Sequence, residues 1–137
     1  MYVIIVLLIS GLARANAAVR TTTQFLTPAT VSQVTLDASH AAVIVDGTFP
    51  NPCYGEPSAM LIQNQNDPTV LVLHLSSPPP KEACSDIEKI KVFNTDVSLV
   101  ELAEMSQVSV DPHMTYTLKV NGSNFTAPIT GSELLLK

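Results

Sequence analysis

Residue types that could carry catalysis are present, but they do not form a pattern typical of an active site. The three histidines, His40, His74 and His113, lie far apart in the chain. There is no G-x-S-x-G motif for a nucleophilic serine, and no D-x-D-x-D run for calcium. The five glycines are scattered singly, so no phosphate-binding loop is indicated. We therefore expect no catalytic residue, no metal, no cofactor and no enzymatic activity, with a role for His113 beside Asp111 as the exception left open.

The two cysteines, Cys53 and Cys84, allow only one intramolecular bridge. They lack the C-x-x-C spacing that is typical of zinc sites and redox-active pairs. Closing a loop of this length stabilises a folded protein by about 3.5 kcal/mol in the chain-entropy model. We expect a structural disulfide.

Residues 50–57, here called the 50–57 loop, are the strongest candidate for a binding surface. Their sequence contains three prolines and the first cysteine, so the loop is restricted and loses little entropy on binding. Tyrosine offers a large contact area with few rotatable bonds. In the alternative interpretation, the tyrosine packs on the bridge and the prolines only end strands. The candidate contact residues are Pro50, Asn51, Pro52, Tyr54 and Glu56.

The N-terminal residues resemble a targeting signal. Residues 2–9 are an unbroken apolar run, and Ala15, Asn16 and Ala17 form an A-x-A cleavage pattern. The run is shorter than the ~20 residues that a membrane span needs. This predicts a signal peptide at residues 1–17, cleavage near Ala17 and a secreted or periplasmic product. A buried N-terminal strand is the alternative, because no lysine or arginine precedes the run.

The length and charge of the sequence limit its organisation and its partners. The 137 residues correspond to one domain, and the net charge of −5 disfavours nucleic acid and anionic lipid. After the signal we expect a mobile lead-in or edge strand at 18–30 and one folded domain at 31–137. The expected partner is a protein or a glycan, without a stable membrane span.

Short alternating segments, typical of β-strands, dominate the rest of the sequence. The best helical window is 98–105, and 132–137 reads as a short tail. Asn121-Gly122 predicts a type I′ hairpin turn. Because there is no tryptophan, a bridge of the antibody type is not expected. The pattern predicts an all-β domain, a single immunoglobulin-like or antiparallel β-sandwich of about seven strands with one disulfide. The expected strands are 31–36, 41–45, 59–63, 70–75 (covered on both faces), 90–99 with a bend at 94–96, 115–120 and 123–129.

The layout of residues 47–127 shows a resemblance to a known group of proteins. Pro50-Asn51-Pro52-Cys53 is followed by Cys84 and then by the stretch Tyr116-Thr117-Leu118-Lys119-Val120-Asn121-Gly122. This layout resembles uncharacterised small secreted bacterial β-sandwich proteins with a P-x-P-C…C…Y-x-V-x-V-N-G arrangement, often labelled as lipoproteins. The resemblance implies a β-sandwich with one disulfide and no established activity. The sequence departs from the group because no cysteine stands at the predicted cleavage site.

Together these features predict an exported, non-catalytic β-sandwich module with a binding or structural role in the cell envelope or secretome. The alternative is a protease inhibitor that acts through the 50–57 loop, and a small hydrolase or lectin-type enzyme ranks last. The motifs Asn121-Gly122-Ser123 and Asn124-Phe125-Thr126 match the acceptor pattern for N-glycosylation. We favour the interpretation that they are turn asparagines that match the acceptor pattern by chance.

Overall fold

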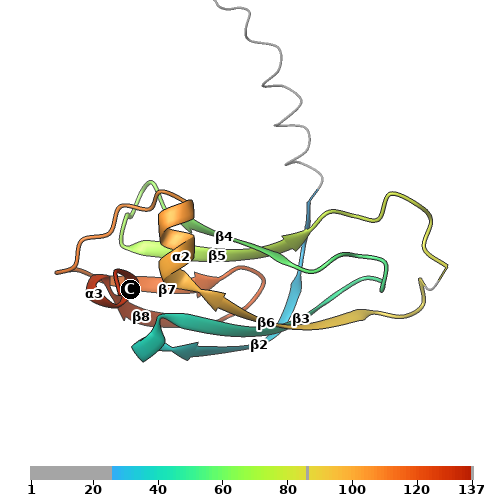
Figure 1. The fold of residues 1–137 in the computed structure, drawn as a ribbon, viewed down its shortest axis with the longest axis horizontal. Helices are drawn as coiled ribbons and strands as arrows, with labels where there is room; N and C mark the ends of the chain where they lie inside the picture. The colour runs from blue at the N-terminus through green and yellow to red at the C-terminus, as the bar shows by residue number, and fades with distance from the viewer. Residues whose placement is uncertain (1–25, 86, 137) are drawn as a thin grey trace, which may run out of the picture.

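Two β-sheets form the layers of the computed structural model, which describes residues 26–85 and 87–136 (Figure 1). The larger sheet contains β1 (Thr27–Pro28), β4 (Ser58–Gln63), β5 (Val70–Ser77), β7 (Thr115–Val120) and β8 (Thr126–Thr130). The smaller sheet contains β2 (Thr30–Asp37), β3 (Ala42–Phe49) and β6 (Lys91–Ser98). The predicted all-β fold with one disulfide is confirmed. The predicted signal peptide at 1–17, and the lead-in as far as residue 25, lie outside the described residues.

The core lies between the sheets and follows from strand alternation. Successive side chains of a strand point to opposite faces, so every second residue of β5 is buried: Leu71, Leu73, Leu75 and Ser77. The other face of β5, with Val72 and His74, is only half-buried. The expectation that both faces of this strand are covered is therefore wrong, because only the inner face meets the second sheet.

β5 organises the larger sheet. It pairs with β4 along one edge, and with β7 and then the short β1 along the other. The β5–β7 pairing is parallel, whereas the other pairs are antiparallel. Parallel neighbours need a long crossover connection. The polypeptide supplies it by passing through β6 of the smaller sheet before it returns as β7.

The expected bend at 94–96 is absent, because β6 runs straight through and pairs residue by residue with β3. Its polar side chains Asn94 and Asp96 point to solvent and do not interrupt the strand. The helical window is confirmed as α2 (Leu99–Met105), whose N-cap is Ser98. The expected tail instead begins with α3 (Gly131–Leu134), which has a Thr130–Glu133 capping box.

The turn between β7 and β8 differs from the predicted type I′ form. Only Gly122 has a positive φ, 82°, whereas a type I′ turn needs positive φ at both central residues. The Ser123 hydroxyl donates to the Val120 carbonyl at 2.8 Å and accepts the Phe125 N–H at 3.2 Å. These side-chain bonds hold the backbone in a loop, so β8 begins at Thr126 and not at residue 123.

One end of the sandwich is closed by α2, α3 and the short 3₁₀ helix η1 (Ala38–His40). The 50–57 loop lies at the opposite end (Figure 1). Within residues 26–85 and 87–136, no helix is long and apolar enough to cross a membrane.

Candidate functional site

An aromatic stack supports the 50–57 loop from below. The ring of Phe49, at the end of β3, stacks on Tyr54 with centroids 5.4 Å apart and an interplanar angle of 7°. Phe49 also contacts Phe93 of β6 at 5.3 Å, and both phenylalanines are buried. Gly47 makes room for this packing, because a Cβ there would lie 2.6 Å from both Phe93 Cζ and the Thr30 carbonyl oxygen. The loop is thus anchored to the core through its tyrosine.

The predicted disulfide Cys53–Cys84 is confirmed and ties the loop to a second loop. Cys53 lies between β3 and β4, and Cys84 lies between β5 and β6, with a Cα–Cα distance of 5.9 Å. Both loops therefore lie at the same end of the sandwich. Neither cysteine belongs to the hydrophobic core of the described residues.

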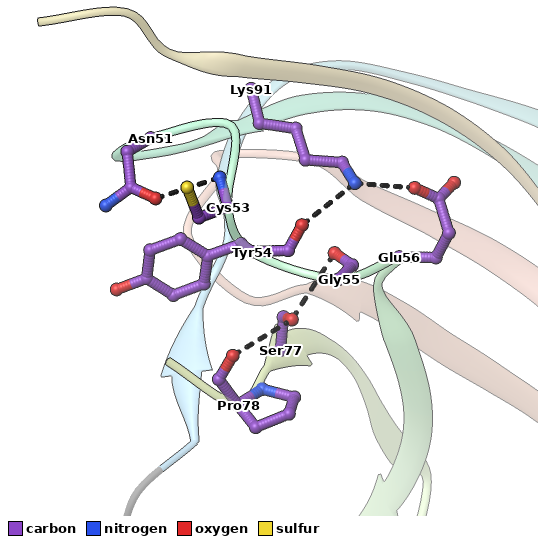
Figure 2. A network of polar contacts seen from close by, with 8 residues as sticks. All are labelled: Asn51, Cys53, Tyr54, Gly55, Glu56, Ser77, Pro78 and Lys91. Carbon is purple, nitrogen blue, oxygen red and sulfur yellow. Dashed lines mark hydrogen bonds and ion pairs between the residues drawn. The ribbon is translucent and has the colours of Figure 1, made fainter. Parts of the chain in front are cut away.

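A set of polar contacts holds the loop backbone (Figure 2). The Lys91 ammonium donates to the Tyr54 carbonyl at 3.0 Å and pairs with the Glu56 carboxylate at 2.7 Å. The Asn51 side chain accepts the Cys53 N–H at 3.0 Å, and the Ser77 hydroxyl donates to the Gly55 carbonyl at 3.3 Å. Hydrogen bonds therefore restrain both the first half of the loop, at residues 51–53, and the second half, at residues 54–56.

The five candidate residues lie together in this loop, and they are not equally accessible. Pro50, Pro52 and Glu56 are exposed, whereas Asn51 and Tyr54 are half-buried. Tyr54 packs on the Phe49 ring, and its hydroxyl accepts a hydrogen bond from Thr27 at 3.4 Å. The tyrosine therefore fixes the loop to the core.

Lys91 and Ser77 are site residues that sequence reasoning missed. Lys91 belongs to a stretch of mixed charges that reads as a solvated surface. Strand alternation could have identified Lys91, because Lys91, Phe93 and Val97 share the inward face of β6. The Lys91 side chain is accordingly 21% exposed, whereas that of Glu56 is 83% exposed.

A second cluster, Asp37, Ser39 and His40, brings together residue types of a catalytic triad. The Ser39 hydroxyl donates to Asp37 Oδ1 at 2.6 Å, and His40 Nδ1 lies 2.7 Å from Asp37 Oδ2. These hydrogen bonds, first from Ser39 and then from His40, lower the pKa of the Asp37 carboxyl. In a triad the serine hydroxyl bonds the ring nitrogen opposite the one that faces the acid. Here Ser39 lies 3.2 Å from the same Nδ1, so the cluster is a hydrogen-bonded turn.

The other histidines lie apart from this cluster and from the loop. His113 donates its backbone N–H to Asp111 Oδ1 at 2.9 Å, which closes a turn. His74 is half-buried on the outer face of β5 and pairs with Met60 of β4. In the part of the protein that the structure describes, no three His, Cys, Asp or Glu residues are grouped closely enough to hold a metal ion.

Comparison with known proteins identifies no relative of this protein. No family model, no curated protein and no solved structure matches the sequence. The resemblance to small secreted bacterial proteins stays a prediction, and function is inferred from the geometry of the 50–57 loop.

Proposed function

We propose that this protein is an exported, non-catalytic β-sandwich module that binds a protein or a glycan through the 50–57 loop. One observation carries the proposal. An exposed loop is held by a disulfide, an aromatic stack and side chains from two strands.

The physical advantage of this arrangement is preorganisation. A flexible loop must be ordered when it binds, which costs about 0.5–1.5 kcal/mol for each immobilised side chain. In the 50–57 loop much of that ordering is already present, because prolines restrict the backbone and both halves are anchored. Loops held on a rigid scaffold are common positions for binding residues.

The exposed groups of the loop indicate a partner with both apolar and polar surface. Pro50 and Pro52 offer apolar area, and Glu56 offers a carboxylate. The side-chain oxygen Oδ1 of Asn51 accepts the Cys53 N–H, whereas the side-chain nitrogen Nδ2 has no hydrogen-bond partner among the described residues. A ligand that accepts from Asn51 and donates to Glu56 fits this surface.

The alternative function, protease inhibition, fits the loop less well. Proteases bind their substrates and many of their inhibitors as extended strands. Residues 51–54 instead form a turn, in which the Tyr54 N–H donates to the Asn51 carbonyl at 3.5 Å. We expect no inhibition of a broad panel of proteases at micromolar concentration.

Export is part of the proposal and rests on the signal-like residues 1–17. The disulfide supports it, because such bonds persist in oxidising compartments.

Site-specific photo-crosslinking tests the proposal. A photoreactive residue is placed at Pro52 in the loop or at Glu101 on α2, at the other end of the sandwich (Figure 1). Each protein is then exposed to the envelope and secreted fractions of its host. We expect a defined adduct at Pro52 and none at Glu101. Equal labelling at the two positions, or an adduct at Glu101 alone, would remove the loop as the binding site.

A further inference from the structure

We propose that Asn121 is a site of spontaneous deamidation in the folded protein. It lies in the turn between β7 and β8 and is followed directly by Gly122. This modification is independent of the 50–57 loop and of the function proposed for it.

The reaction needs only the polypeptide and water. The backbone nitrogen of Gly122 loses its proton and attacks Cγ of Asn121, so an N–C bond forms and a five-membered succinimide closes. The bond between Cγ and the amide nitrogen Nδ2 breaks, and this nitrogen leaves as ammonia after taking up a proton. Water then opens the succinimide at one of its two carbonyls. The products are aspartate or isoaspartate, and in isoaspartate the backbone runs through the former side chain.

The structure leaves both reacting groups accessible. Asn121 is exposed, and its side-chain amide has no hydrogen-bond partner within the described part of the protein. The Gly122 N–H is likewise without an acceptor there. Glycine has no side chain to shield the attacking nitrogen, and its φ of 82° is one that other residues rarely adopt.

The other asparagines of residues 26–136 lack this combination. Asn51 precedes a proline, which has no N–H to attack with. Asn124 precedes Phe125, whose N–H is donated to the Ser123 hydroxyl at 3.2 Å. The side chain of Asn94 is bonded to Asp46 at 2.6 Å.

Asn64 and Asn66 are restrained in the β4–β5 loop. The Asn64 side chain accepts the backbone N–H groups of Asn66 and Asp67 at 2.8 and 3.2 Å. Attack on Asn66 would come from the backbone nitrogen of Asp67, whose N–H is already donated to the Asn64 side chain. The protein thus contains matched internal controls for Asn121.

Deamidation would alter a hydrogen-bonded turn between two strands of the larger sheet. The Asn121 N–H donates to the Leu73 carbonyl at 2.9 Å, and the Ser123 N–H closes the turn on Val120 at 3.2 Å. Isoaspartate would add one methylene to the backbone between these two bonds, together with one negative charge. The same bonds restrain the turn, so we expect the reaction to be faster where one of them is removed.

Incubation of the intact, oxidised protein at mildly alkaline pH tests the proposal, because base removes the proton from the attacking nitrogen. Peptide mapping by mass spectrometry follows each asparagine, and conversion adds about 1 Da. We expect conversion at Asn121 that rises with pH, with isoaspartate among the products, while Asn124 and Asn64 stay intact. Ser123→Ala removes a brace without changing the Asn-Gly pair, so it should convert faster than the wild type.

A synthetic peptide of residues 117–126 gives the rate of Asn121 deamidation in the absence of the fold. Asn121 that stays unmodified in the folded protein, over a time in which the peptide converts fully, would overturn the proposal. Earlier conversion at Asn124 or Asn64 would overturn it as well.

Discussion

At the scale of single residues, Lys91 makes two contacts of unequal energetic weight. Its bond to the Tyr54 carbonyl is partly shielded from water, whereas its ion pair reaches the exposed Glu56. Hydrogen bonds to charged groups contribute about 1.5–3 kcal/mol, and exposed ion pairs contribute about 0–1 kcal/mol. The loop backbone therefore depends on the carbonyl contact.

We expect Lys91→Met to lower the free energy of unfolding by about 1–2 kcal/mol, because it removes the charged donor from Tyr54 and keeps the apolar stem. Denaturant titration measures this loss. Glu56→Gln is the matched control and should change stability little, since that carboxylate is exposed. Equal losses in the two variants would contradict this assignment.

Asp67 carries a pH dependence at the same scale. The Thr69 hydroxyl and the Thr69 N–H both donate to its carboxylate, and they lower its pKa below the usual value of 3.8. A carboxyl whose pKa is lower in the folded protein adds stability above its unfolded pKa. That stability is lost as the pH falls through the lowered pKa. We expect NMR titration to place the Asp67 pKa below 3.8, and Asp67→Asn to flatten the acid limb of the stability curve. Titration at or above 3.8 would refute this.

At the scale of elements, α2 protects the outer edge of β4. The Leu61 N–H donates to the Ser106 hydroxyl at 3.4 Å, just after the helix, and the Gln63 side chain bonds the backbone of Ser109. An uncovered strand edge is a template for aggregation. The position of α2 depends on its N-cap at Ser98, whose hydroxyl accepts the Glu101 N–H at 3.3 Å.

Ser98→Ala should destabilise the protein by about 1 kcal/mol, because an N-cap acceptor is lost. Ser98→Asp supplies an equivalent acceptor and should restore most of the stability. Thermal unfolding compares the three proteins. A Ser98→Asp variant that is as unstable as Ser98→Ala would show that the capping bond is not the cause.

At the scale of the whole molecule, the disulfide joins two loops, and neither of its cysteines is part of the hydrophobic core of the described residues. We expect the double variant Cys53→Ser/Cys84→Ser to fold, with stability lower by about 2–4 kcal/mol, because the unfolded polypeptide is no longer constrained. Circular dichroism and denaturant titration test both parts. Loss of the β-sheet signal would mean that the core needs the bridge.

Much of the fold follows from local patterns in the sequence, and much of the site does not. Alternation alone places Tyr116, Leu118 and Val120 of β7 in the core, and proline spacing marks the 50–57 loop. The parallel β5–β7 pair and the Lys91 contact join distant segments, which local periodicity does not specify. The turn after β7 took a different form because the Ser123 side chain bonds the backbone.

The proposed function requires that the 50–57 loop is ordered before it meets a partner. Backbone ¹⁵N relaxation of the oxidised protein tests it most directly, at Tyr54, Gly55 and Glu56. We predict order parameters near those of rigid backbone, about 0.85, with a clear fall in the Cys53→Ser/Cys84→Ser variant. Values below about 0.6 in the oxidised protein would show a flexible loop and contradict the account.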